Sequence, residues 1–292
     1  MTANQDTSRV LPPIGLIAGN GRMPVLVAQG IGRAGRSLAV VAIRDQATPR
    51  LASMADSFSW VGVARVGSWI RELKRAGVRQ AVMIGGVHKK AIYSPMRVLR
   101  YIPDLRTMHL WYVKVRKDRR DNAILLAVAD ELAAEGIELI SSVEYCKEHL
   151  ANEGTMTRTA VPRGAAADIE FGWRIARASA DLDIGQSLAV RERDIIAVEA
   201  MEGTNAMIHR AGELCPTGGW TLIKVARGEQ DMRFDVPTIG PETIRSLKTA
   251  GCTCLVVEAG RTLIVDKPVT LALADRLGIA VVGKRQPIAN GQ

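Results

Sequence analysis

IGLIAGNGRMPVLVAQGIGRAGRSLAVVAI (residues 14–43) decides the fold of the first half of this chain. It opens with a short apolar run that ends at Gly19, continues with a helical stretch from Pro24 to about Ala34, and closes with a second apolar run at 38–43. Short runs that are apolar throughout are typical of strands buried on both faces of a parallel sheet. A strand, a helix and a strand in this order predict a βαβ unit.

The same alternation continues through the first half of the chain. The predicted helices cover 69–77 and 121–136, and the predicted strands cover 78–86 and 137–142. Gly77 and Gly136 end the two helices, and Asp121 is the predicted N-cap of the second. We therefore expect a Rossmann-like parallel sheet with helices on both faces over residues 1–147.

Residues 148–165 are the predicted linker, because this polar stretch lacks periodicity and carries glycine and proline. Beyond it we expect a C-terminal catalytic α/β domain over 166–292, built on a mixed sheet. Its predicted helices cover 166–182, 204–214 and 241–251, its hairpin covers 187–200 with a turn near 192–194, and its further strands cover 220–225, 254–260, 262–266 and 279–283.

The composition excludes several classes of protein. With 47% hydrophobic and 24% charged residues, the 292-residue chain is neither disordered nor a disulfide-stapled miniprotein. No apolar run reaches the roughly 18 residues that a membrane-spanning helix needs. The N-terminus lacks the basic start and apolar core of an export signal, so we expect a cytoplasmic protein.

The chain carries 39 basic and 30 acidic residues, a net charge of +9. This surplus suits a polyanionic ligand, an anionic membrane surface or nucleic acid, and does not by itself choose among them. The four cysteines form no C-x-x-C pair and the four histidines no metal-binding pattern, so a structural zinc site is not expected. A catalytic metal would be a hard ion held by oxygen, such as magnesium.

The turn after the first predicted strand carries Gly19, Asn20 and Gly21 directly before a helix. Glycines allow close backbone approach, and the free N–H groups at a helix start attract anions, so these residues are candidates for substrate phosphate binding. The third glycine of the dinucleotide fingerprint is replaced by Pro24. A tight turn of purely structural use is equally consistent with the pattern.

A segment rich in carboxylates, QDMRFDVPTIG (230–240), is the most informative part of the second half. In an extended strand Asp231, Arg233 and Asp235 share one face, where two carboxylates flanking a guanidinium could hold a divalent cation and a phosphate together. A solvent-exposed edge with ordinary ion pairs is the alternative. Further polar residues end predicted strands, and we expect them to converge: Glu199, Glu202, Glu258, Arg261 and Asp266.

Six segments in order resemble one known family along nearly the whole chain: GLIAGNGRMP, RRDNAILLAVADEL, DIGQ, AVEAMEGTNAMI, QDMRFDVPTIG and VEAGRTLIVD. It is the UDP-2,3-diacylglucosamine diphosphatase family of lipid A biosynthesis, of the type not built on a metallophosphoesterase core. The resemblance implies magnesium-dependent hydrolysis of the diphosphate, which gives UMP and 2,3-diacylglucosamine 1-phosphate (lipid X). It also implies two domains with the lipid held between them, and a homodimer.

The resemblance also carries site residues. The family's essential aspartate, before Pro-Thr-Ile-Gly, matches Asp235, so it implies that Asp235 is catalytic, with Arg233 and Gln230 from the same block. Matching blocks supply Thr204, Glu199 and Arg261 as expected substrate-binding residues. The expected magnesium ligands are Asp235, Asp231 and Glu258.

Residues 92–120 combine many arginines and lysines with apolar and aromatic residues. This mixture suits an anionic membrane surface or a lipid-lined cleft, and equally suits a subunit interface. We expect a peripheral protein on the inner face of the inner membrane. Nucleic-acid binding is not expected, because no recognised module accompanies the charge.

The leading hypothesis is therefore a phosphoanhydride hydrolase acting on a nucleotide-linked acylated sugar. Magnesium would neutralise the diphosphate, Arg233 would counter developing charge, and Asp235 would hold the metal or activate water. The alternatives are a binding module for nucleotides or lipid phosphates without turnover, and an NAD(P)-binding oxidoreductase.

Overall fold

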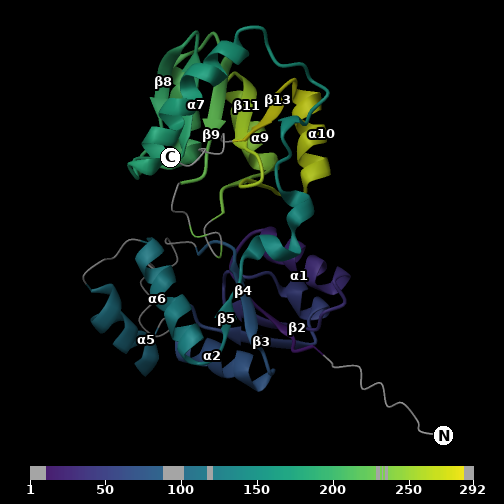
Figure 1. Cartoon of the computed structure of the whole chain (residues 1–292), viewed down its shortest axis with the longest axis vertical. Helices are drawn as coiled ribbons and strands as arrows, with labels where there is room; N and C mark the ends of the chain where they lie inside the picture. Colours follow the sequence, from purple (N-terminus) through teal and green to yellow (C-terminus); the bar gives the residue numbers. More distant parts are fainter. Residues whose placement is uncertain are drawn as a thin grey trace, which may run out of the picture. The chain divides into compact units, whose positions relative to one another are not determined.

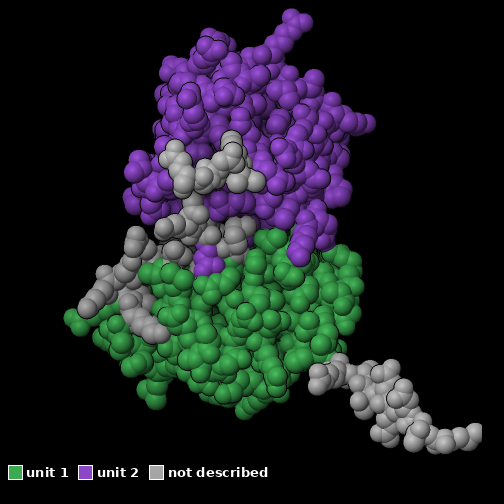
Figure 2. All heavy atoms as spheres, viewed as in Figure 1, with its two compact units in different colours: residues 1–146, 232–234 green, residues 147–231, 235–292 purple. Residues whose placement is uncertain are grey.

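A computed structural model describes residues 11–87, 102–116, 121–227, 231, 233 and 236–285. The chain divides into two compact units, shown in different colours in Figure 2. Unit 1 comprises residues 1–146 and 232–234, and unit 2 comprises residues 147–231 and 235–292.

Unit 1 is built on a sheet of five parallel strands in the order β3-β2-β1-β4-β5. The strands are β1 (Ile14–Ala18), β2 (Leu38–Ile43), β3 (Ser57–Val61), β4 (Gln80–Ile84) and β5 (Glu138–Leu139). The expected Rossmann-like parallel sheet is confirmed. Strand β3 was not predicted, because it is an edge strand whose sequence SFSWV is largely half-exposed and lacks an apolar run. The strand expected at 137–142 is reduced to its two paired residues, β5.

The helices of unit 1 flank this sheet (Figure 1). They are α1 (Met23–Arg33), α2 (Val66–Arg75), α5 (Leu105–Leu110) and α6 (Asp121–Ala134), with short helical turns η1 (Pro49–Met54), η2 (Trp111–Val115) and η3 (Ser142–Tyr145). One core cluster joins Trp69 and Leu73 of α2 and Leu132 of α6 to sheet residues such as Ile17 and Val41. Their burial follows the helical spacing of the apolar residues.

Unit 2 contains a six-stranded sheet in the order β6-β13-β11-β9-β7-β8. The strands are β6 (Gly154–Thr155), β7 (Ser187–Arg191), β8 (Asp194–Val198), β9 (Trp220–Lys224), β11 (Cys252–Glu258) and β13 (Ala280–Lys284). Strands β9, β11 and β13 are parallel, whereas β6 and the β7–β8 hairpin add antiparallel pairs. The mixed sheet and the hairpin turn at Glu192 and Arg193, both at positive φ, match the sequence prediction.

Alternation along the strands of this sheet places its apolar residues in two separate cores. Leu222 and Leu255 pack in the core that contains helices α8, α9 and α10, whereas Ile223 and Val256 pack against α7. The helices are α7 (Ala165–Asp181), α8 (Thr204–Leu214), α9 (Pro241–Thr249) and α10 (Lys267–Leu277), with a 3-10 turn η4 (Lys147–His149). Helices therefore cover both faces (Figure 1).

The carboxylate-rich segment departs from its predicted form. The structure gives no strand at Asp231 and places Arg233 in a turn, and the strand in this region is β10 (Thr238–Ile239), which pairs with β12 (Leu263–Ile264). A β-strand requires hydrogen bonds to a neighbouring strand, and in the described part of this segment only Thr238 and Ile239 pair with β12. The prediction that Asp231 and Arg233 lie in one strand was therefore wrong. Asp235 lies outside the described residues.

Candidate active site

Polar residues lie at the edge of the unit 2 sheet where its parallel strands have their C-terminal ends. Strands β9, β11 and β13 run in parallel, so their last residues, Lys224, Glu258 and Lys284, lie at the same edge. Strand β7 runs the opposite way and begins there: Ser187 stands directly opposite Lys224. Ligands of open α/β sheets bind at this edge.

A cluster of four side chains forms where β7, β8 and β9 meet α8. We call Ser187, Glu199, Thr204 and Lys224 the strand-end cluster. Lys224 Nζ donates a hydrogen bond of 3.0 Å to Thr204 Oγ1, which in turn donates one of 2.9 Å to Glu199 Oε1. Ser187 Oγ lies 3.5 Å from the same Thr204 oxygen. The cluster therefore combines a cation, a carboxylate and two hydroxyls at the first residue of α8, where helix N–H groups favour anions.

The two carboxylate oxygens of Glu199 differ in their hydrogen bonding. Glu199 Oε2 is buried and has no hydrogen-bond partner among the described residues. A buried acceptor without a donor costs about 1–3 kcal/mol, so such an atom is a candidate for contact with a ligand or an ordered water.

Local sequence explains why Glu199 is held in place. Its backbone N–H donates 2.9 Å to Ser187 O, which continues the pairing of β7 with β8 by one residue. Its carbonyl lies so close to Gly185 that a Cβ there would stand 1.9 Å from the oxygen. The glycine of the Asp-Ile-Gly-Gln segment therefore permits the close passage of the chain that positions Glu199.

Glu202 supports the loop rather than the cluster. It accepts a 3.2 Å hydrogen bond from the backbone N–H of Ala200 and a 2.6 Å hydrogen bond from Arg210. Backbone hydrogen bonding and then Arg210 lower the pKa of the Glu202 carboxyl. The side chain is thereby committed to closing the turn between β8 and α8.

Glu258, which ends β11, is enclosed by positive groups. Its side chain is only 2% exposed, and Oε2 accepts bonds from Arg177 of α7 (3.1 Å) and from the backbone N–H of Ala226 (2.8 Å). Oε1 accepts a 3.4 Å bond from Arg261. We call Glu258, Arg177 and Arg261 the Glu258 clamp. Because Arg177 also donates to Ala226 O at 2.7 Å, the clamp fixes the chain where it leaves β9.

Four of the residues predicted from the sequence thus lie at or beside this edge: Glu199, Thr204, Glu258 and Arg261. Asp231 and Arg233 lie in the segment that follows β9, outside any strand. Gln230 and Asp235 lie outside the described residues. At this edge the described residues form two separate hydrogen-bonded groups, the strand-end cluster and the Glu258 clamp, and their convergence into one site stays a prediction.

The described residues offer little support for the predicted metal ligands. Both oxygens of Glu258 are occupied by the clamp, and a hard cation would have to displace two guanidinium groups and an amide. Within the described ranges no group of three or more acidic, histidine or cysteine residues could hold a metal ion. Glu258 does not fit a magnesium site.

The glycine turn of unit 1 is closed by the chain itself. Gly19 N donates to Ile84 O (2.9 Å), and Asn20 and Gly86 exchange N–H···O bonds of 2.8 and 3.1 Å. A Cβ on Gly19 would stand 2.7 Å from the carbonyl oxygens of Gly85 and Gly86. The close packing of the loops after β1 and β4 therefore explains why residue 19 is a glycine. The N–H groups of Gly19 and Asn20 donate to backbone carbonyls and are not available to a phosphate. A Cβ at Gly21, in contrast, would meet open space.

Sequence reasoning missed Ser187, Lys224 and Arg177. Lys224 is the single charged residue that ends the apolar run WTLIK, and that position was its one available signal. Ser187 and Arg177 are polar residues in a strand and a helix without any motif. Their roles depend on the register between β7 and β9 and on the packing of α7, which one sequence does not display.

The basic stretch can be described in part. Residues 88–101 and 117–120 lie outside the described residues. In the remainder, several large apolar side chains are exposed: Ile102, Leu105, Met108, Trp111, Tyr112 and Val113. No described helix has the length and apolar character needed to cross a bilayer.

Comparison with known proteins covers both units. Residues 13–149 match the family model of the LpxI N-terminal domain, and residues 152–282 match that of the LpxI C-terminal domain. The chain is 34% identical over 280 residues to the UDP-2,3-diacylglucosamine pyrophosphatase LpxI of Caulobacter vibrioides, covering 92% of this chain and 96% of that protein. Among solved structures, the biotin carboxylase domain of a single-chain bacterial carboxylase covers 70% of this chain and 55% of its own, at 16% identity and a TM-score of 0.22. That likeness is too slight to carry an argument.

Proposed function

The chain belongs to the LpxI family and is a hydrolase, and we propose that it cleaves the diphosphate of UDP-2,3-diacylglucosamine in lipid A biosynthesis. The proposed products are 2,3-diacylglucosamine 1-phosphate (lipid X) and UMP. The observation that carries the proposal is the 34% identity to a pyrophosphatase of that name across 92% of the chain. A binding module without turnover and an NAD(P)-dependent oxidoreductase are correspondingly disfavoured.

The strand-end cluster is the proposed place of diphosphate cleavage. A diphosphate carries several negative charges, and its cleavage requires positioning and charge neutralisation more than covalent help from the protein. Lys224 Nζ, already 3.0 Å from Thr204 Oγ1, supplies a point charge beside the start of α8. Thr204 can donate its hydroxyl proton to a phosphate oxygen once it releases Glu199.

Residues of the following segment complete the proposed mechanism. Arg233 offsets the charge that develops on the phosphoryl oxygens, and Asp235 orients the attacking water and accepts its proton. Water attacks the phosphorus next to the sugar, and UMP leaves with the bridging oxygen. The proposed substrate-binding residues around this centre are Gln230, Glu199 and Arg261. In unit 1, a Cβ added at Gly21 would meet no other atom within 4 Å, so the turn there has open space beside it.

Magnesium belongs to the proposal on the strength of the family resemblance. The expected ligands are reduced to Asp231 and Asp235, because Glu258 is occupied by its two arginines. When bound, the ion would neutralise the diphosphate. The proposal is tested by UMP release in excess chelator with magnesium added back. Release that is unchanged by the chelator would contradict it.

Peripheral membrane association and a homodimer also belong to the proposal. The support for the membrane is the net charge of +9 together with the exposed apolar side chains of α5 and η2, a combination suited to an anionic lipid surface. Electrostatic binding weakens as salt rises. Flotation with anionic vesicles at low and high ionic strength tests the membrane association. Equal binding at both ionic strengths would contradict it.

Light scattering of the purified protein tests the homodimer. A monomer would contradict it.

The proposed reaction is tested by incubating the protein with UDP-2,3-diacylglucosamine and magnesium in water enriched in heavy oxygen. We expect UMP release, with the label in the acylated sugar 1-phosphate. Label in UMP would overturn the site of attack and leave the hydrolase standing. Substrate binding without any release would overturn the proposed function.

A further inference from the structure

The Glu258 clamp holds the backbone just beyond the end of β9. Strand β9 pairs with β11 as far as Lys224, which stands opposite Val257. Two residues later, the N–H of Ala226 donates a 2.8 Å bond to Glu258 Oε2, and the Ala226 carbonyl accepts a 2.7 Å bond from Arg177 Nη1. Side chains thus bond both polar groups of the Ala226 backbone, a task that falls to a neighbouring strand inside a sheet.

The next residue along the chain is bonded as well. The Arg227 carbonyl accepts a 2.9 Å bond from Arg261 Nη2, and Arg227 Nη1 pairs with Asp183 Oδ1 at 2.9 Å. Asp183 lies between α7 and β7, and Arg261 lies between β11 and β12. Two successive residues beyond β9 are therefore bonded to groups from several other parts of unit 2.

This fixed backbone lies between two parts of the proposed active site in the sequence. Lys224 of the strand-end cluster comes two residues before Ala226. Arg227 is followed within eight residues by the groups of the proposed mechanism: Gln230, Asp231, Arg233 and Asp235. A displacement of the backbone here would move groups on both sides of it, and a misplacement of about 1 Å can lower a rate about 100-fold.

Arg177 and Glu258 are too enclosed to bind a substrate themselves. Their side chains are 11% and 2% exposed. Both oxygens of Glu258 accept bonds, and Arg177 Nη1 donates both to Glu258 and to the carbonyl of Ala226. These two side chains can therefore influence a reaction only through the backbone that they hold.

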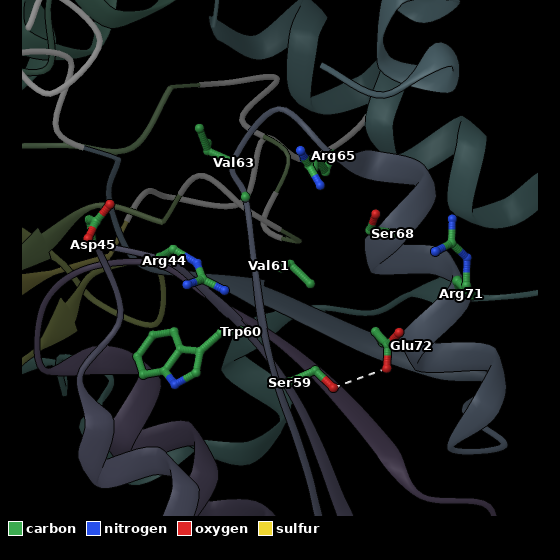
Figure 3. Close-up of a pocket in the computed structure, with 11 residues that line it drawn as sticks. Arg44, Asp45, Ser59, Trp60, Val61, Val63, Arg65, Ser68, Arg71 and Glu72 are labelled. Carbon is green, nitrogen blue, oxygen red and sulfur yellow. Dashed lines mark hydrogen bonds between the residues drawn. The ribbon is translucent and has the colours of Figure 1, made fainter. Parts of the chain in front are cut away.

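Arginines that line a cavity in unit 1 are placed differently. Beside β3 lies a cavity of about 580 Å³, where Arg44 and Arg71 lie on opposite sides and Ser59 is bonded to Glu72 (Figure 3). Both arginines are exposed. Arg71→Met is therefore a control for the loss of a guanidinium that does not hold the end of β9.

We propose that Arg177 and Glu258 are positioning residues for diphosphate cleavage. They hold the backbone of Ala226 and thereby place Lys224 on one side of it and the segment that carries Asp235 on the other. The inference rests on the proposed function, which assigns the chemistry to these groups. Neither Arg177 nor Glu258 takes part in bond cleavage.

Steady-state kinetics of UMP release tests the proposal, with kcat expressed per folded molecule. Arg177→Met should lower kcat by about tenfold or more and change KM less than about threefold, because the side chain does not contact the substrate. The matched control is Asp181→Asn, which removes the half-exposed partner of Arg177 and leaves the bonds to Ala226 in place. It should keep kcat within about twofold of wild type, as should Arg71→Met.

A double variant separates positioning from stability. Arg177→Met combined with Glu258→Met replaces a buried ion pair by apolar side chains, a change that is often neutral or stabilising. The melting temperature should therefore rise above that of Arg177→Met, whereas kcat should stay at least about tenfold below wild type because Ala226 still lacks both bonds. Glu258→Gln is the milder variant: one acceptor oxygen replaces two, and kcat should fall about threefold or more.

Wild-type kcat in Arg177→Met, in the double variant or in Glu258→Gln would overturn the proposal. A raised KM at unchanged kcat would also overturn it, because the pair would then bind substrate. Wild-type protein that releases no UMP would overturn the proposed function and this inference together. Release by wild type with kcat unchanged in all the variants would overturn this inference alone.

Discussion

Both units present the carboxyl ends of parallel strands at one edge of a sheet, but the two edges are built from different groups. In unit 1 the loops after β1 and β4 are joined by backbone hydrogen bonds between Asn20 and Gly86. In unit 2 the corresponding edge carries charged side chains, among them Lys224 and Glu258. The same topology therefore leads to a closed backbone seam in one unit and to a polar cluster in the other.

This difference shows that strand topology alone does not locate a binding site. A ligand requires donors and acceptors that the chain has not already used. In unit 1 the N–H groups of Gly19 and Asn20 are used by backbone hydrogen bonds, whereas in unit 2 the buried Oε2 of Glu199 has no hydrogen-bond partner among the described residues. We therefore propose that bond cleavage takes place in unit 2.

The largest effect is expected for Asp235, in the segment that follows the edge of unit 2. Asp235→Ala should lower the rate of UMP release by about 10²–10⁴-fold, because it removes the proposed base. Asp194→Ala, at the exposed start of β8, is the control and should retain near-normal release. Retention of wild-type rates by Asp235→Ala would move the chemistry away from this segment.

The Glu258 clamp should matter for stability. Arg177→Met leaves a carboxylate that is 2% exposed without its main partner, and we expect the free energy of unfolding to fall by about 3–5 kcal/mol. The exposed pair of Arg245 and Glu242 is the control, and Arg245→Met should cost less than about 1 kcal/mol. Urea denaturation measures both. Equal losses in the two variants would show that the clamp does not stabilise the edge.

The packing of the loops after β1 and β4 predicts that alanine substitutions at two glycines of unit 1 change the stability in opposite directions. Gly19→Ala places a Cβ 2.7 Å from two carbonyl oxygens and should destabilise the protein by about 1–3 kcal/mol. Gly32→Ala, in helix α1 with open space around its Cβ, should stabilise it by about 0.5–1 kcal/mol. Thermal unfolding of the two variants checks the sign of each effect, and a neutral Gly19→Ala would mean that the seam is loose.

The smallest effect concerns the surface charges of unit 1. Hydrogen bonds from Lys74 and then Arg106 lower the pKa of Glu135 from 4.5 to about 2. Because the folded-state pKa is depressed, this contribution is present above about pH 4.5 and is lost as the pH falls toward 2. The melting temperature of Glu135→Gln should therefore lie below that of wild type at pH 7 and approach it at pH 3. A difference that is the same at both pH values would contradict this assignment.

Much of the fold follows from short-range pattern. The apolar runs predicted at 14–19 and 38–43 became β1 (Ile14–Ala18) and β2 (Leu38–Ile43), and the helix predicted at 204–214 has those bounds in the structure. These elements are apolar throughout or strongly amphipathic, so the local sequence pattern alone indicates which of their residues are buried. Edge strand β3 and helix α10 were not foreseen, because neither carries an uninterrupted apolar run or a strong stripe.

The candidate site was predictable only in its individual residues. Glu199, Thr204 and Glu258 could be proposed because polar residues at strand ends are typical of α/β enzymes. That Thr204 lies between Glu199 and Lys224, and that Glu258 is enclosed by Arg177, depends on strand register and helix packing. The prediction of an extended strand at Asp231 failed for the same reason, since pairing with β12 is a long-range property.

The central claim is that the strand-end cluster is where the diphosphate is cleaved, and two lysines test it most directly. Lys224 and Lys284 both end parallel strands at the same edge of the same sheet, but Lys284 lies over the ring of Trp173, 5.8 Å from its centroid, and outside the cluster. Steady-state kinetics of UMP release from UDP-2,3-diacylglucosamine should show kcat/KM lowered at least about 100-fold in Lys224→Met and changed less than about threefold in Lys284→Met. Equal kcat/KM in the two variants, with both proteins folded, would contradict the claim.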